Sequence, residues 1–139
     1  MIPVDLSRIL ITETSDQQVI WLKEHGGERT FPIVIGIFEA IAIKRKLSEE
    51  PLERPLTHDL LANVIAGLGA KVERIVVTSL RRTTFYANII LQRNGETIEI
   101  DSRPSDAIAL AVRVDAPLFA EEEVLDSAGK PEGTSDDIE

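Results

Sequence analysis

The predicted secondary structure of this chain repeats itself, and this repetition restricts the fold more than any other feature. Three strand-like runs followed by a helix occupy residues 4–47, and the same order returns over residues 71–114. A further helix over 57–68 is inserted between the two halves. The pattern predicts an α+β fold, in which two β3α units form one mixed or antiparallel sheet with helices packed on it.

Short stretches of similar sequence lie at corresponding places in the two halves, 66 to 68 residues apart. The matched stretches are RILIT at 8–12 with RIVVT at 74–78, EAIAI at 39–43 with DAIAL at 106–110, and GE at 27–28 with GE at 95–96. Their constant order favours an internal duplication. The alternative is chance similarity between segments rich in isoleucine.

Turn-forming residues locate the ends of the strands. Asn94-Gly95 is a typical two-residue hairpin turn, and His25-Gly26-Gly27 predicts another. Pro32 has no N–H for a ladder, so the strand over 30–35 should lie at an edge or start there. We expect Thr57 to cap the inserted helix, whose apolar stripe is Leu60, Leu61, Val64, Ile65 and Leu68.

The helix over 104–114 contains the run AIALAV at 107–112, which is apolar on every side. Such a helix must be covered on more than one side. A chain of 139 residues has little material for this, so we expect a second layer or a subunit interface. This argument favours a homo-oligomer, with a dimer first.

Length and charge define the domain. A chain of this size forms one domain, predicted over residues 1–128, followed by an acidic disordered tail over 129–139. Residues 121–139 hold eight acids and one base, whereas residues 1–120 hold sixteen acids and fourteen bases. The body is therefore nearly neutral, and the net charge of −9 does not exclude a polyanionic partner.

Several classes of function lose support. The sequence has no cysteine, no apolar run long enough for a membrane span and no signal-peptide pattern, so we expect a cytoplasmic protein without a membrane partner. Walker-type GxxxxGK[ST], GxGxxG, GxSxG and HExxH motifs are missing as well. Nucleotide-driven, dehydrogenase and serine-hydrolase activities are therefore disfavoured, and we expect no organic cofactor.

The first candidate site runs from a strand end to a helix start, where free N–H groups and the helix dipole attract anions. Asp101 and Asp106 flank this point and can hold a divalent cation such as Mg²⁺ or Mn²⁺, while Arg103 can bind a phosphate. In the structural alternative, Ser102 caps the helix, Asp106 complements its dipole, and Arg103 pairs with Asp101.

Glu39 holds the place in the first unit that Asp106 holds in the second. The duplication could bring both acids to one groove as metal ligands or as an acid–base pair. Alternatively, both are first-turn acids that complement helix dipoles.

A second polar cluster lies before the inserted helix. His58 is suited by its ordinary pKa to general base work or to metal binding, and Arg54 could contact a phosphate. The alternative is a solvated first turn, in which Asp59 complements the dipole. His25 lies in a glycine turn and is expected to be a surface residue.

Two basic runs could contact a nucleic-acid backbone: Lys44-Arg45-Lys46 at a helix end, and Arg81-Arg82 at a strand turn. Both also have an ordinary structural explanation as solvated charges. The six aromatic residues form no evident stacking platform.

Long motifs of this chain resemble the bifunctional nuclease domain family. They are RPLTHDLL at 54–61, GIFEA at 36–40, DSRPSDAIALA at 101–111, APLF at 116–119 and EEVL at 122–125. The resemblance covers residues 4–126 in order. The family pattern is intact at the residues singled out above, namely Glu39, His58, Asp59, Asp101, Arg103 and Asp106.

The resemblance implies a nuclease that cleaves RNA and DNA with little sequence preference, because plant members are described in this way. In this hypothesis Asp101, Asp106 and Glu39 hold Mg²⁺ or Mn²⁺, and His58, with Asp59 beside it, works as general base or acid. Arg54 and Arg103 would stabilise the phosphate charge. The alternative is a non-catalytic oligomeric binding or regulatory module, in which the same motifs are caps and ion pairs.

Overall fold

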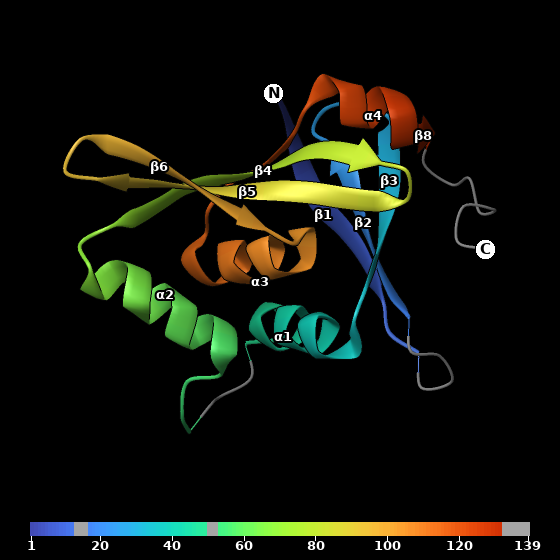
Figure 1. Cartoon of the computed structure of the whole chain (residues 1–139). Helices are drawn as coiled ribbons and strands as arrows, with labels where there is room; N and C mark the ends of the chain where they lie inside the picture. The colour runs from blue at the N-terminus through green and yellow to red at the C-terminus, as the bar shows by residue number, and fades with distance from the viewer. Residues whose placement is uncertain (13–16, 50–52, 132–139) are drawn as a thin grey trace.

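The computed structural model describes residues 1–12, 17–49 and 53–131, and the strand and helix patterns of the sequence become twelve elements there (Figure 1). The strands are β1 (Ile2–Leu10), β2 (Gln18–Glu24), β3 (Arg29–Ile35), β4 (Lys71–Arg81), β5 (Thr84–Arg93), β6 (Glu96–Ser102), β7 (Leu118–Ala120) and β8 (Lys130–Pro131). The helices are α1 (Ile37–Leu47), α2 (Thr57–Gly67), α3 (Pro104–Val114) and α4 (Glu122–Ala128).

All the strands belong to one sheet in the order β6-β5-β4-β7-β1-β2-β3-β8. The two β3α units therefore extend outward in opposite directions from β7, each beginning with its first strand beside β7. Every neighbouring pair is antiparallel except β4 and β7, which are parallel. The predicted α+β fold with a mixed sheet built from two such units is confirmed.

The turn residues act as expected. Asn94 and Gly95 both have positive φ angles, 52° and 81°, as the tight turn between β5 and β6 requires. Pro32 pairs with Trp21 of β2, while on the other side β8 pairs only with Arg29 and Thr30. At Pro32, β3 is therefore an edge strand, so the missing N–H interrupts no pairing with a neighbouring strand.

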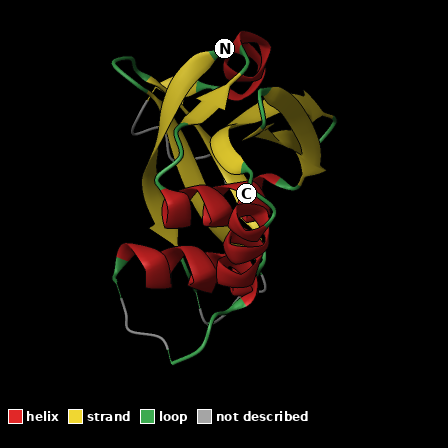
Figure 2. Cartoon of the chain, turned by 90° about the vertical axis from the view of Figure 1, so that its left-hand side faces the viewer, coloured by secondary structure: helices red, strands yellow, loops and turns green. Residues whose placement is uncertain are grey.

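Helices α1, α2 and α3 form two levels below the sheet, and α4 lies apart from them at the other end of the molecule (Figures 1 and 2). Helix α3 packs directly against β3, β4 and β5, and it contacts α1 and α2 on its other side. Residues 107–111 of α3 are all buried. Alanine at alternate positions lets the neighbouring backbones approach closely, so α3 forms the centre of the core.

We expected an oligomer because the apolar helix over 104–114 needs cover on more than one side, and the burial of α3 removes this argument. The chain covers this helix by itself, because the sheet lies on one side and α1 and α2 lie on the other. The second layer that we expected is thus present within one protomer. A homo-oligomer remains a prediction without support from α3.

Helix α2 differs from expectation in two ways. Leu61 and Ile65 pack against the core, but Leu60, Val64 and Leu68 of the predicted inward stripe are exposed. Helix α2 contacts the rest of the protein along a narrow face because it forms the outer level of the helices. Thr57 is already helical, and the N-cap position belongs to Leu56, whose N–H donates to Asp59 Oδ2 at 3.0 Å.

The C-terminal elements close one end of the molecule. Arg29 of β3 donates to Glu122 and Asp126 of α4, each at 3.0 Å, and forms a further ion pair with Glu24 of β2. Strand β8 then pairs with β3, so the ordered chain continues past residue 128, beyond the predicted start of the tail. Residues 132–139 of that tail lie outside the described residues. No helix in the described part of the chain has the length and apolar character needed to cross a membrane.

Gly129 should tolerate no side chain. A Cβ at this position would collide with the backbone oxygen of Leu125 and lie 3.1 Å from Cβ of Arg29. We expect Gly129→Ala to lower the free energy of unfolding by about 1–3 kcal/mol, as overpacking usually does. Urea unfolding followed by circular dichroism measures this change.

Gly67→Ala is the matched control, because a Cβ there meets no atom within 4 Å and the residue ends helix α2. We expect this variant to be neutral or more stable by up to about 1 kcal/mol. Equal losses in both variants would contradict the steric explanation.

Candidate active site

The first turns of three helices meet at one place below the sheet. Glu39 lies in the first turn of α1, His58 in that of α2, and Asp106 in that of α3. The predicted meeting of Glu39 and Asp106 in one groove is found here, and the inserted helix adds the histidine. Residues far apart in the sequence therefore form one polar cluster.

His58 and Asp106 form a direct contact between α2 and α3 in this cluster. Nε2 of His58 lies 2.9 Å from Oδ1 of Asp106. The side chains are 11% and 30% exposed, respectively. A carboxylate accepts hydrogen bonds, so Nε2 carries the hydrogen and the other ring nitrogen, Nδ1, is left to act as an acceptor.

Arg103 holds the second oxygen of Asp106. Its Nε donates to Asp106 Oδ2 at 2.9 Å, and its Nη2 lies 2.8 Å from the same oxygen and 3.9 Å from Oε2 of Glu39. The hydrogen bond that Arg103 donates to Asp106 raises the pKa of Arg103 above its ordinary value, so the guanidinium stays charged. About two thirds of this side chain is exposed, which leaves it accessible to a ligand.

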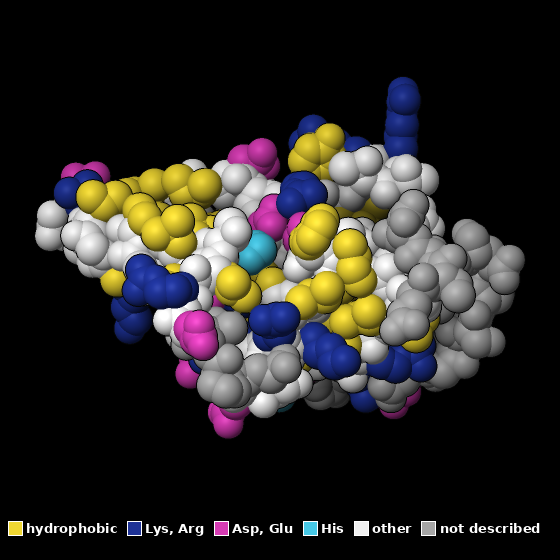
Figure 3. Space-filling model, turned by 90° about the horizontal axis from the view of Figure 1, so that it is seen from below, with side chains coloured by type: hydrophobic (Ala, Val, Ile, Leu, Met, Phe, Trp, Pro, Cys, Tyr) yellow, Lys and Arg dark blue, Asp and Glu magenta, His cyan; other side chains and the backbone are white. Residues whose placement is uncertain are grey.

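The cluster lies in a groove with a volume of about 980 Å³. Its polar lining includes Glu39, His58, Arg103, Asp106 and also Arg45 of the basic run. Figure 3 shows this mixture on the face seen from below: a histidine lies in the middle of the face beside acidic and basic side chains, with hydrophobic side chains on both sides. The face offers a charged centre with an apolar border.

The structural alternative for residues 101–106 is wrong in its details. The N-cap position of α3 belongs to Arg103, and the hydroxyl of Ser102 donates to the Arg103 carbonyl oxygen at 2.8 Å. Arg103 pairs with Asp106 and Glu39 and makes no ion pair with Asp101 within the described residues. This arginine therefore connects two helices across the groove.

Asp59 has a different environment from its neighbour His58. Its Oδ1 accepts from Nε of Arg113 at 2.8 Å, and its Oδ2 accepts from the Leu56 N–H. Arg113 is 4% exposed and also donates to the carbonyl oxygens of Ala109 and Ala42. One oxygen of Asp59 thus holds α2 against α3 and the other caps α2, which gives this residue a structural place beside the candidate catalytic role.

The other predicted site residues lie apart from the cluster. Asp101 is exposed on β6 opposite Asn88, and Arg54 is exposed before α2. Neither side chain makes a hydrogen bond or an ion pair with any residue in the described ranges. His25 is exposed in its turn, as expected, and its Nδ1 contacts Asp5 at 2.8 Å.

Metal binding was also predicted for these carboxylates. In the part of the chain that the structure describes, no group of three or more histidine and acidic side chains is placed to hold a metal ion. Both oxygens of Asp106 already have protein donors. The arrangement does not fit a metal with three protein ligands, and a role for Mg²⁺ or Mn²⁺ stays a prediction.

Sequence reasoning missed Arg45 as a groove residue and Arg113 as the partner of Asp59. Arg45 was visible only as part of a basic run. Arg113 gave no signal, because a cation in the last turn of a helix has an ordinary dipole explanation.

Comparison with known proteins gives a consistent result. The family model described as bifunctional nuclease domain matches residues 20–133. Over 121 residues the chain is 41% identical to an uncharacterized protein of Mycobacterium tuberculosis (strain ATCC 25618 / H37Rv), which covers 87% of this chain and 72% of that protein.

Plant proteins match at lower identity. Bifunctional nuclease 2 of Oryza sativa subsp. japonica is 28% identical over 112 residues, covering 78% of this chain and 34% of that protein. Bifunctional nuclease 1 of Arabidopsis thaliana is 24% identical over 103 residues, covering 72% of this chain and 32% of that protein. This chain therefore spans about a third of the plant proteins that it matches.

Asp59→Asn tests the structural place of this residue. Burial raises the pKa of Asp59, but the Leu56 N–H and the Arg113 guanidinium outweigh it, so the pKa lies below its ordinary value. A lowered pKa means that the charged form stabilises the fold above about pH 4, and that this stabilisation disappears as the pH falls through the folded-state pKa.

We expect Asp59→Asn to cost about 2 kcal/mol of unfolding free energy at pH 7, and less as the pH falls below 4. Urea unfolding of both proteins over a pH series measures the difference. A cost that does not change with pH would contradict the role of the charge.

Proposed function

Since this chain belongs to the bifunctional nuclease domain family, we propose that it hydrolyses phosphodiester bonds of RNA and DNA with low sequence specificity. The observation that carries the proposal is the His58–Asp106 pair beside the exposed Arg103 guanidinium in an open groove. Phosphodiester hydrolysis can use a histidine that a carboxylate holds in place and an adjacent cation that a phosphate can reach.

His58 acts as the general base. Asp106 binds Nε2–H and thereby fixes the tautomer and the direction of the ring, so that Nδ1 can accept a proton from a water molecule. The water oxygen forms a bond to phosphorus as the bond from phosphorus to the leaving sugar oxygen breaks. The leaving oxygen takes a proton from the imidazolium or from solvent, and the products are a phosphomonoester and an alcohol.

Arg103 binds the phosphate. Its Nη1 makes no hydrogen bond with the described residues, so this group can donate to a phosphate oxygen without giving up Asp106. The positive charge stabilises the extra negative charge that develops on the equatorial oxygens. Glu39 lies near Arg103 and orients it from the α1 side.

Divalent metal assistance belongs to the same proposal. An ion held by Asp106 and Glu39 would polarise the phosphate, whereas Asp101 lies apart from both on β6. Binding the ion requires Asp106 to exchange a protein donor for the metal. Assays in Mg²⁺, Mn²⁺ and EDTA distinguish a metal-dependent reaction from one that His58 and Arg103 support alone.

Asp106→Asn is the test of the site. We expect it to lower cleavage of fluorescent single-stranded RNA and DNA at least ~100-fold, because asparagine is uncharged and has one acceptor oxygen, so it cannot hold both His58 and Arg103. His58→Gln should lose activity to a similar extent. The rates of purified wild type and variants, prepared side by side, are compared.

Asp115→Asn is the matched control for the same chemical change. Asp115 ends helix α3 with a φ angle of 56°, where asparagine is well tolerated, and it lies at the opposite end of the helix from the site. It should cleave like the wild type. Equal trace activity in all preparations would point to a contaminating nuclease and contradict the proposal.

The second candidate is a non-catalytic oligomeric binding module. Two observations favour it: this chain's own donors already hold both oxygens of Asp106, and Leu56, Leu60, Val64 and Leu68 form an exposed apolar row along α2. In that case no preparation cleaves nucleic acid, and Asp106→Asn lowers only the melting temperature. Light scattering would then show a dimer or larger assembly.

A further inference from the structure

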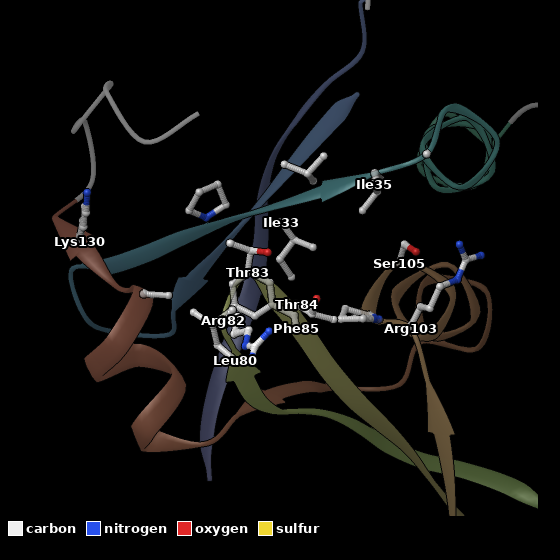
Figure 4. Close-up of a pocket in the computed structure, with 15 residues that line it drawn as sticks. Ile33, Ile35, Leu80, Arg82, Thr83, Thr84, Phe85, Arg103, Ser105 and Lys130 are labelled. Carbon is white, nitrogen blue, oxygen red and sulfur yellow. The ribbon is translucent and has the colours of Figure 1, made fainter. Parts of the chain in front are cut away.

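A second hollow lies on the other side of Arg103, at the start of α3. Its volume is about 670 Å³, within the range of small-molecule sites. Figure 4 shows the residues that line it. Arg82, Thr83 and Thr84 come from the tip of the β4–β5 hairpin, and Arg103 and Ser105 come from the start of α3. Lys130 lies at the end of the hollow away from α3. Because Arg103 also lines the groove of His58 and Asp106, the two hollows adjoin.

The charge of this hollow differs from that of the whole protein. Its lining contains three cations, Arg82, Arg103 and Lys130, and no acidic residue, although the chain carries a net charge of −9. Arg82 is exposed and forms no ion pair within the described residues. A cation that no carboxylate neutralises is available to an anionic ligand.

Ser105 gives an independent indication of a ligand. The residue is 5% exposed and lines the hollow, and its hydroxyl makes no hydrogen bond with the described residues. Its backbone N–H is among the free donors in the first turn of the eleven-residue helix α3, where the dipole favours an anion. A hydroxyl that lines the hollow and has no partner among the described residues is available to a ligand there.

The remaining wall is apolar. Phe85 lines it, with its ring centroid 5.5 Å from that of Phe31, and Ile33 and Ile35 of β3 extend the surface. An apolar wall beside a cationic rim suits a ligand that has a flat apolar part and a phosphate. Inorganic phosphate alone would leave most of the volume unused.

We propose that this second hollow binds a nucleoside monophosphate unit, with its phosphate held by Arg82 and Ser105 and its base against the wall at Phe85. The inference rests on the proposed function in one respect. In a nucleic-acid strand, the neighbouring phosphodiester would lie on the other side of Arg103, in the groove beside His58 and Asp106. The hollow thus recognises one nucleotide of the substrate beside the bond that is cut.

Calorimetric titration of the full chain in EDTA tests binding without turnover. The probes are adenosine 5′-monophosphate, adenosine, inorganic phosphate and a single-stranded DNA hexamer. We expect the monophosphate to bind more tightly than either adenosine or phosphate. Tighter binding of the hexamer identifies a strand as the source of the nucleotide, while weaker binding identifies a free nucleotide and overturns the link to the cleavage site.

Arg82→Gln should weaken binding of the monophosphate about tenfold, the effect expected when one charge-assisted hydrogen bond is lost. Arg81→Gln is the matched control, because the Arg81 guanidinium lies over the Tyr86 ring at 4.8 Å and does not line the hollow. Ser105→Ala provides a second variant should Arg82→Gln lower the melting temperature. Equal weakening by Arg81→Gln, or no binding by the wild type, would overturn the proposal.

Failure of this proposal can be separated from failure of the proposed function. Cleavage that depends on Asp106, without binding of the monophosphate, would overturn the nucleotide site and leave the nuclease. Binding that depends on Arg82, without any cleavage, would leave the site and overturn the nuclease.

Discussion

The packing of α3 is the constraint on which the rest of the structure depends. Its small side chains allow the sheet to approach from one side and two helices from the other, so that each half of the chain contacts the same central element. Arg113 secures this contact from the inside, because it binds Asp59 of α2 and the carbonyl oxygen of Ala42 in α1. Arg103 connects α3 and α1 at the surface, where it remains accessible. One arginine therefore stabilises the helix cluster and the other serves the groove.

Much of the fold follows from local sequence. The strand and helix order, the turn at Asn94-Gly95 and the edge position of Pro32 depend on neighbouring residues, and these predictions are confirmed. The position of β7 between β1 and β4 depends on pairing between distant segments, which no local pattern encodes. The inward stripe on α2 was predicted incorrectly for the same reason. Periodicity shows that a helix has an apolar face, but it does not show how much of that face a neighbour covers.

The candidate site could be predicted only in part. The correspondence between Glu39 and Asp106 in the two units indicated that they meet, and the structure places both in one groove. The pairing of His58 with Asp106 was not foreseeable, since it depends on where the inserted helix packs. Capping preferences suggested Thr57 and Ser102, but both N-cap positions belong to other residues. In α2, Asp59 accepts from the backbone N–H of Leu56 at the N-cap. In α3, Asp106 accepts from the side chain of Arg103.

The position of β7 has a consequence for how the protein is made. This strand joins the two halves of the sheet, yet it comes after both of them in the sequence. On the ribosome, β1 and β4 are synthesised long before residues 118–120, and until then each presents an open edge to other chains. Closure of the sheet must await the synthesis of residues 118–120. The folded state is thus completed from the C-terminal end, by a segment of three residues that belongs to neither unit.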